Sequence, residues 1–110
     1  MKITQETNGN VKLLHLDGKL DVHSTPMVLE LLEELVAAGE ANIVLDMQKV
    51  RFVSSYGLGV LVTTNRSIKE RGGSLKLAGM KQEVKVPFEI TGLLPQFEVY
   101  GTSEEALGSF

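Results

Sequence analysis

The 110-residue sequence predicts an α/β fold: one domain, residues 1–110, in which about four helices cover a central mixed sheet of about five strands. Three observations support this prediction. Near the N-terminus, Asn8-Gly9-Asn10 separates two runs that can pair as a hairpin. Short apolar runs rich in β-branched residues then alternate with longer segments of helical periodicity. The composition, 43% apolar and 23% charged, is that of an ordinary globular chain.

The first expected elements are the N-terminal hairpin and a helix. Lys2–Thr7 and Val11–Leu16 flank a turn in which Asn and Gly tolerate the positive φ of a tight hairpin. A helix is expected to start at Thr25-Pro26, because the Thr25 hydroxyl can cap free N–H groups and the Pro26 ring fits the first turn. Apolar residues then recur at helical spacing, and Gly39 provides the stop.

The middle of the chain is expected to form two strands around a second helix. Ile43-Val44-Leu45 is a short apolar run of the kind that forms a strand buried on both faces of a helix-covered sheet, so we predict a central strand. The second helix should follow Ser54-Ser55 and end at Gly72-Gly73. Ser74–Ala78 predicts a further strand. Helices link these parallel strands, so right-handed crossovers are expected.

The last third of the chain predicts a weaker helix around Lys81–Thr91, a strand at Phe97–Tyr100 and a short helix that begins near Ser103. Two glutamates follow Ser103, and their negative charges interact favourably with the positive end of the helix dipole. Pro87 falls within the first of these helices and removes an intrahelical hydrogen bond unless it lies in the first turn. We therefore expect that helix to start late or to be kinked.

Charge and composition exclude several classes of function. The formal net charge of −3 provides no basic field for phosphate backbones or anionic lipids, so nucleic acid is not an expected partner. Without cysteine there is no thiolate nucleophile and no thiolate metal site. The N-terminus lacks the apolar core of a secretory signal, and no apolar run approaches the roughly 18 residues that span a bilayer. We expect a cytoplasmic protein without membrane insertion.

The segment from Phe52 to Gly59 carries the most suggestive group of side chains. Two hydroxyls, Ser54 and Ser55, stand before a helix whose free N–H groups and partial positive charge stabilise anions. One interpretation is that a serine simply caps the helix; the other is that one of them carries a phosphate. Gly57 and Gly59 are costly inside a helix, which favours a compensating reason such as the close approach of another protein's backbone.

Three motifs, in order along the chain, resemble the STAS family. Ser54–Gly59 (SSYGLG) is similar to the family signature Asp-Ser-x-Gly-Leu-Gly, which follows the central strand and opens the second helix. Leu16–Asp21 (LDGKLD) is placed like the family's Gly-x-Leu-Asp element before the first helix. Ile90–Leu93 (ITGL) is similar to the Thr/Ser-Gly-Leu that ends the third helix. Together the three are far more specific than any one of them.

The resemblance implies an anti-sigma factor antagonist that acts as a phosphorylation-controlled partner switch. In such antagonists the signature serine, here Ser55, is phosphorylated by a partner that is both an anti-sigma factor and an ATP-binding serine kinase, and a phosphatase resets it. The unphosphorylated form binds the anti-sigma factor and thereby releases the sigma factor. No catalytic residue, cofactor or metal is implied. The loop before the first helix flanks Ser55, so the predicted partner-binding residues are Asp21, His23, Ser24, Thr25, Ser54, Ser55, Tyr56, Gly57 and Gly59.

One residue departs from the signature, because Ser54 stands where antagonists usually carry Asp. The charge beside the acceptor is missing, so kinase recognition is expected to differ. Two alternatives therefore stay open: a non-switching STAS subunit of a transporter or signalling assembly and, more remotely, a small enzyme or nucleotide-binding protein that holds a phosphate in the Ser54–Gly59 loop. A deep polar pocket at Ser55 is typical of the last class, whereas we expect a convex, exposed helix start.

Other polar residues have simpler interpretations. Asp21, His23 and Ser24 include the groups of a catalytic triad, but residues so close together before a helix are more typical of turns and caps. His15, within an apolar strand, is expected to be satisfied or outward-facing, with no second His or Cys at metal-ligand spacing. Tyr56 is either an exposed interface contact or a locally packed side chain.

Overall fold

The computed structural model, which describes residues 1–110, begins with the predicted hairpin. Strand β1 (Lys2–Asn8) pairs antiparallel with β2 (Val11–Leu20). Gly9 lies in the turn with a φ of 61°, a left-handed conformation that glycine adopts without strain. β2 runs four residues beyond the apolar run that predicted it, because it continues to pair with its other neighbour in the sheet as far as Leu20.

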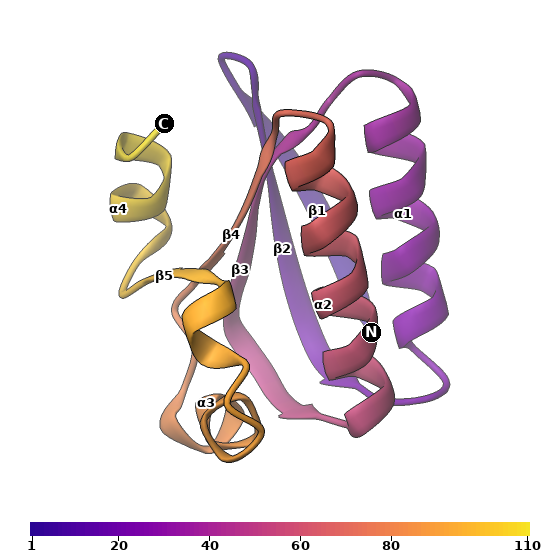
Figure 1. The fold of residues 1–110 in the computed structure, drawn as a ribbon, viewed down its shortest axis with the longest axis vertical. Coiled ribbons are helices and arrows are strands. Elements are labelled where there is room, and N and C mark those ends of the chain that lie inside the picture. The colour runs from indigo at the N-terminus through magenta and orange to yellow at the C-terminus, as the bar shows by residue number, and fades with distance from the viewer.

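The remaining elements alternate helix and strand, as expected for this fold class (Figure 1). They build one mixed sheet in the order β1-β2-β3-β4-β5, in which β1 is antiparallel and the other neighbours are parallel. The predicted five strands and four helices are confirmed. In chain order the elements are α1 (Thr25–Ala37), β3 (Asn42–Val53), α2 (Ser55–Glu70), β4 (Ser74–Ala78), α3 (Gln82–Ile90), the 3₁₀ turn η1 (Leu94–Gln96), β5 (Glu98–Tyr100) and α4 (Ser103–Gly108).

The two faces of the sheet are covered unequally. Helices α1, α2 and α3 pack on one face over the main core, to which β2 contributes Leu14 and Leu16. The short α4 lies on the other face and closes a second, smaller cluster of Val11, Leu13, Val44, Ala78 and Ala106 (Figure 1). We call this second side the outer face. None of the helices combines the length and the apolar character needed to cross a bilayer.

The central strand is longer than its sequence suggests. Ile43, Val44 and Leu45 are fully buried in β3, the middle strand, as predicted. However, β3 has twelve residues and continues to Val53, because β2 pairs with it to the register Leu20↔Val53. Charged residues such as Arg51 interrupt the apolar run in this second half, so no continuous apolar pattern indicated a strand there.

Helix α1 begins where predicted, with Pro26 in its first turn, but Thr25 does not cap it. Thr25 is the first helical residue, its side chain is buried, and its hydroxyl has no hydrogen-bond partner. The preceding Ser24 occupies the cap position, yet its Oγ bonds the Lys19 carbonyl and the Asp21 carboxylate instead of a helical N–H. The first turn of α1 is therefore held by packing and by the loop before it.

Of the two consequences expected of Pro87, a late start or a kink in the third helix, the late start is wrong. Helix α3 begins at Gln82, and Pro87 lies in its interior, where it has no N–H to donate. Two buried side chains, Val84 and Phe88, anchor the helix in the main core, and the Phe88 ring packs edge-on against Phe97 at 5.4 Å between centroids. This packing outweighs the lost hydrogen bond.

Candidate functional site

The two predicted site segments meet at one edge of the sheet, where β2 and β3 end side by side. The Ser54 N–H donates to the Leu20 carbonyl at 2.8 Å, directly after the last paired residues of the two strands. From this point Asp21–Thr25 leads into α1, and Ser55 opens α2. Parallel strands bring their carboxyl ends to the same edge, so residues more than 30 positions apart form one surface.

Adjacent serines at this edge have different roles. Ser54 is the N-cap of α2, with extended backbone angles and an Oγ that accepts the Gly57 N–H at 3.0 Å. Ser55 is the first helical residue; its side chain is exposed and makes no hydrogen bond within the protein. The capping role therefore belongs to Ser54, and Ser55 presents a free hydroxyl at the start of the helix.

The start of α2 is an electrostatically favourable place for negative charge. Its first turn contains no acidic residue, and the N–H groups of Ser55 and Tyr56 have no intrahelical acceptor. An anion attached to the Ser55 side chain therefore lies beside unpaired donors and the positive end of the helix dipole.

Asp21 organises the loop that flanks Ser55. Its Oδ1 accepts the backbone N–H groups of His23 and Ser24, each at 3.0 Å, and the Ser24 hydroxyl at 3.1 Å. The hydrogen bond from the Ser24 N–H, helped by that from His23, holds the pKa of Asp21 below its ordinary value. Asp21, His23 and Ser24 thus form a hydrogen-bonded turn, as the turn interpretation predicted.

The surroundings of the two signature glycines require glycine at only one of the positions. A Cβ on Gly57 would lie 2.7 Å from the Leu20 carbonyl oxygen, so α2 can pack on the end of β2 only with glycine here. This internal contact replaces the expected approach of another protein's backbone. Gly59 is exposed, with nothing within 4 Å of a Cβ. Of the nine predicted contact residues, Thr25 and Gly57 are buried and can only support the surface from below.

Four large apolar side chains are exposed at this edge, and three of them were not singled out in the sequence. Val22, Met27, Phe52 and Tyr56 are each between 44% and 59% exposed, although side chains of this kind are usually inside. They come from the loop after β2, the first turn of α1, the end of β3 and the first turn of α2. Three of them look like ordinary members of a loop, helix or strand in the sequence, and only their shared exposure reveals the group, which we call the apolar rim.

The surface beside Ser55 is hollowed, which corrects the expected convex shape. A hollow of about 510 Å³ lies between α1 and α2 and is lined by Leu29, Ser55, Tyr56, Gly59, Val60 and Thr63. These side chains are apolar or carry hydroxyls, and none is charged. A site for a ligand phosphate uses convergent charged or backbone donors, whereas this lining suits an apolar side chain of a protein partner.

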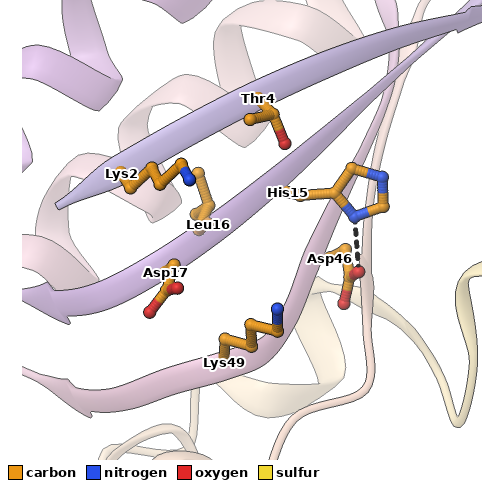
Figure 2. Close-up of a pocket in the computed structure, with 7 residues that line it drawn as sticks. All are labelled: Lys2, Thr4, His15, Leu16, Asp17, Asp46 and Lys49. Carbon is orange, nitrogen blue, oxygen red and sulfur yellow. Dashed lines mark hydrogen bonds and ion pairs between the residues drawn. The ribbon is translucent and has the colours of Figure 1, made fainter.

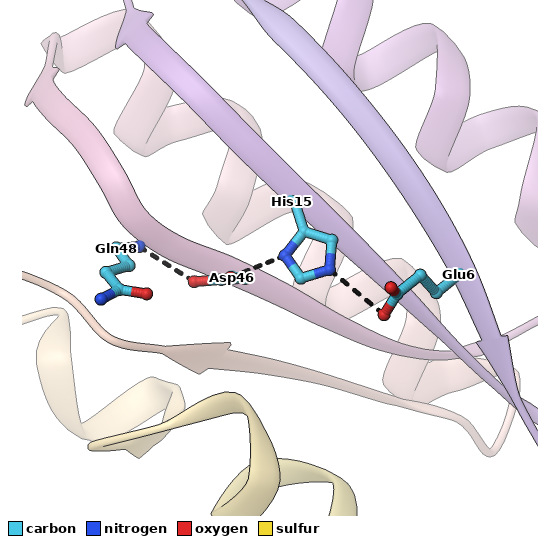
Figure 3. A network of polar contacts seen from close by, with 4 residues as sticks. All are labelled: Glu6, His15, Asp46 and Gln48. Atoms are coloured by element: carbon cyan, nitrogen blue, oxygen red, sulfur yellow. Dashed lines mark hydrogen bonds and ion pairs between the residues drawn. The ribbon is translucent and has the colours of Figure 1, made fainter.

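His15 lies on the outer face of the sheet, away from Ser55, and is satisfied as expected (Figure 3). Its Nδ1 contacts Asp46 Oδ2 at 2.7 Å, and its Nε2 contacts Glu6 Oε2 at 3.3 Å. The hydrogen bond with Asp46 outweighs desolvation and raises the pKa of His15 above its ordinary 6.5. No group of three or more His, Cys, Asp or Glu side chains is arranged to hold a metal ion.

Comparison with known proteins agrees with this geometry. The STAS domain family matches residues 2–106. The chain belongs to the STAS domain family. It is 33% identical over 104 residues to the anti-sigma-B factor antagonist of Bacillus subtilis, with 94% of each chain covered, which places this STAS domain among the anti-sigma factor antagonists.

Solved STAS domain structures share the fold. An anti-sigma factor antagonist from Mycobacterium paratuberculosis has a TM-score of 0.88 at 24% identity, covering 98% of this chain and 92% of that one. SpoIIAA has TM-scores of 0.84 in its unphosphorylated form and 0.77 in the phosphorylated Bacillus form, at 22% and 21% identity. This chain is covered to 98% in both, and the SpoIIAA chains to 95% and 98%.

The three STAS motifs occupy the positions that the resemblance implied. Ser54–Gly59 follows the central strand and opens α2, Leu16–Asp21 ends β2 before α1, and Ile90–Leu93 ends α3. The first two meet at the edge that carries Ser55, through the Ser54–Leu20 hydrogen bond and the Gly57–Leu20 contact. Two parts of the STAS signature thus pack against each other.

Proposed function

We propose that this STAS domain is an anti-sigma factor antagonist whose partner binding is controlled by phosphorylation of Ser55. The observation that carries the proposal is the free, exposed hydroxyl of Ser55 on the first residue of α2, beside a Ser54 hydroxyl already used as a cap. The relationship to the Bacillus subtilis antagonist supports it, as does the existence of SpoIIAA in phosphorylated and unphosphorylated forms.

In this proposal the unphosphorylated domain binds an anti-sigma factor that is also an ATP-binding serine kinase, and so releases a sigma factor in the cytoplasm. The Ser55 oxygen attacks the γ-phosphorus of the partner's ATP, its proton leaves, and ADP departs. A phosphatase later hydrolyses the phosphoester and returns the hydroxyl and inorganic phosphate. Catalysis belongs to the partners, and this chain is their substrate and ligand rather than an enzyme.

The partner surface combines polar groups with the apolar rim. Contact is made by the exposed residues His23, Ser55, Tyr56 and Gly59 and the half-buried Asp21, Ser24 and Ser54, while Thr25 and Gly57 support them from below. Apolar side chains gathered around a small polar centre are typical of the buried middle of protein interfaces. We infer that Val22, Met27 and Phe52 belong to the same surface.

Phosphate at Ser55 opposes binding without disturbing the fold. It adds a charge of about −1.5 to −2 within the apolar rim, where burial against a partner removes its hydration. In the free domain the same phosphate stays in water beside unpaired N–H groups of α2. The charge therefore weakens the complex while the helix start tolerates it.

The absence of Asp at position 54 changes charge rather than structure. The Ser54 Oγ accepts the Gly57 N–H at 3.0 Å, which is the bond that a capping carboxylate would accept. The shape of the helix start is therefore retained, and the kinase meets a less acidic surface.

The test is to incubate the domain with an anti-sigma factor kinase and ATP, and to locate phosphate by mass spectrometry. We expect phosphate on Ser55, none in Ser55→Ala, and normal phosphorylation of the matched Ser54→Ala variant. Ser55→Asp should weaken anti-sigma factor binding by at least about tenfold. Phosphate on Ser54 instead of Ser55 would contradict the switch. So would the absence of any phosphate, if Ser55→Asp also binds the anti-sigma factor as tightly as the wild type. In that case retained binding would favour the non-switching STAS subunit.

A further inference from the structure

The outer face of the sheet is only partly covered by α4. On the open part, charged side chains of β1, β2 and β3 surround a hollow of about 180 Å³ (Figure 2). It is on the side of the sheet opposite to α1 and α2, so it is separate from the surface at Ser55. The hollow is lined by Lys2, Thr4, His15, Leu16, Asp17, Asp46 and Lys49.

The acidic groups of this hollow already have partners. Asp46 accepts the His15 imidazole on Oδ2 at 2.7 Å and the Gln48 N–H on Oδ1 at 3.0 Å (Figure 3). Asp17 Oδ1 lies 3.6 Å from Arg51 Nη1. The second imidazole nitrogen of His15 is engaged by Glu6 at 3.3 Å. Each carboxylate is therefore neutralised in part by a neighbouring cation or donor.

The two lysines of the hollow are not paired in this way. Lys2 enters from β1 and Lys49 from β3, on opposite sides of β2 (Figure 2). No carboxylate oxygen lies within 4.0 Å of either ammonium group. The Thr4 side chain lines the same space and makes no hydrogen bond within the protein. The hollow thus presents two free cations and a free hydroxyl donor.

We propose that this hollow binds a small phosphate-class oxyanion, held by the Lys2 and Lys49 ammonium groups and the Thr4 hydroxyl. Lysine ammonium groups act as point charges that suit phosphate oxygens. At about 30 Å³ for each water in the liquid, the space corresponds to roughly six waters, enough for an inorganic phosphate or a small phosphomonoester with part of its hydration. The site is open to solvent, so we expect weak, salt-sensitive binding.

The test is an NMR titration of the ¹⁵N-labelled domain with sodium phosphate, compared with sodium chloride at matched ionic strength. We expect saturable shifts at the amides of Lys2, Thr4 and Lys49 that chloride does not produce. A parallel titration with glycerol phosphate distinguishes the sources: saturation by both ligands identifies a phosphomonoester site, and saturation by inorganic phosphate alone identifies a free-anion site.

Variants assign the binding to the two lysines. Lys2→Gln with Lys49→Gln should weaken phosphate binding by at least about tenfold. The control is Lys12→Gln, because Lys12 is also a strand lysine but donates to Thr7 Oγ1 and lines no part of the hollow. Unchanged binding in the double variant, equal shifts with chloride, or shifts confined to the start of α2 would each overturn the site.

Discussion

The Oγ of Ser54 lies 3.0 Å from the backbone nitrogen of Gly57 and accepts its N–H. This contact occupies the first of two adjacent hydroxyls and leaves the second, on Ser55, free at the surface. The same Gly57 packs under the end of β2, so the cap, the glycine and the strand edge form one rigid support for Ser55.

Ser54→Ala should lower the free energy of unfolding by about 1 kcal/mol, because one N–H at the start of α2 loses its acceptor. Ser54→Asp keeps an acceptor there and adds a charge that the helix dipole favours. Its urea midpoint of unfolding should therefore equal or exceed that of the wild type. Ser55→Ala is the matched control and should change stability by less than about 0.5 kcal/mol. Equal effects of the two alanine variants in urea titrations would contradict the assigned cap.

Alanine should have opposite effects at the two signature glycines. Gly57→Ala places a methyl group 2.7 Å from the Leu20 carbonyl oxygen and should destabilise the domain by about 1–3 kcal/mol. Gly59→Ala meets nothing within 4 Å and should stabilise it by about 0.5–1 kcal/mol, since alanine is the better helix former. Thermal unfolding of both variants measures the difference, and a stabilising Gly57→Ala would refute the close packing.

The apolar rim should matter for binding but not for folding. Tyr56→Ala should weaken anti-sigma factor binding by about tenfold or more, because aromatic anchors dominate interface energies. Phe110→Ala is a matched control: its ring has the same 44% exposure, but the C-terminus lies at the opposite end of the molecule from the start of α2 (Figure 1). Similar losses of affinity in both variants, measured by calorimetry, would show that the rim has no special role.

The His15 contacts should stabilise the fold more at acidic pH. Because Asp46 raises the pKa of His15 in the folded state above 6.5, this stabilisation is fully present below pH 6.5 and disappears as the pH rises through the folded-state pKa. The stability difference between wild type and His15→Gln should therefore shrink from about pH 5.5 to pH 8.5. The side chain is 37% exposed, so the effect should be small.

Asp46→Asn provides the control for this pH dependence. It removes the main cause of the raised pKa, so the His15 titration followed by NMR should move to lower pH than in the wild type. A His15 titration midpoint that is unaffected by Asp46→Asn, or a stability difference that grows with pH, is incompatible with the pairing.

Lys76 should be coupled to Ser109. Its side chain is almost completely buried beneath the C-terminal segment, and its ammonium donates to the Ser109 Oγ at 2.6 Å and the Ser109 carbonyl at 3.2 Å. Ser109→Ala should cost about 1 kcal/mol in the wild type, because a buried cation loses an acceptor. In a Lys76→Met background the same substitution should cost less, because only the hydrogen bond from the Ser109 hydroxyl to the Ala106 carbonyl is then lost, and urea titrations of all four proteins measure this coupling. Equal costs in the two backgrounds would exclude it.

Much of the architecture followed from local signals. The hairpin turn at Gly9, the stop at Gly39 and the apolar stripes of α1 and α2 depend on backbone preferences and periodicity, which are readable along the chain. The second half of β3 and the interior position of Pro87 were not predictable in this way. β2 pairs with that half of β3, and Phe88 holds α3 in the core, so contacts distant in sequence decided both.

The sequence by itself determined the fold class, the family and the position of Ser55 at the start of a helix, because turn chemistry, apolar spacing and ordered motifs are local properties. Only the tertiary structure decided that Ser54 is the cap while Ser55 is free, that Gly57 packs on Leu20, and that an apolar rim surrounds the site. The physical reason is that hydrogen-bond partners and exposure depend on which strand ends the sheet brings together, and spacing along one chain does not specify that edge.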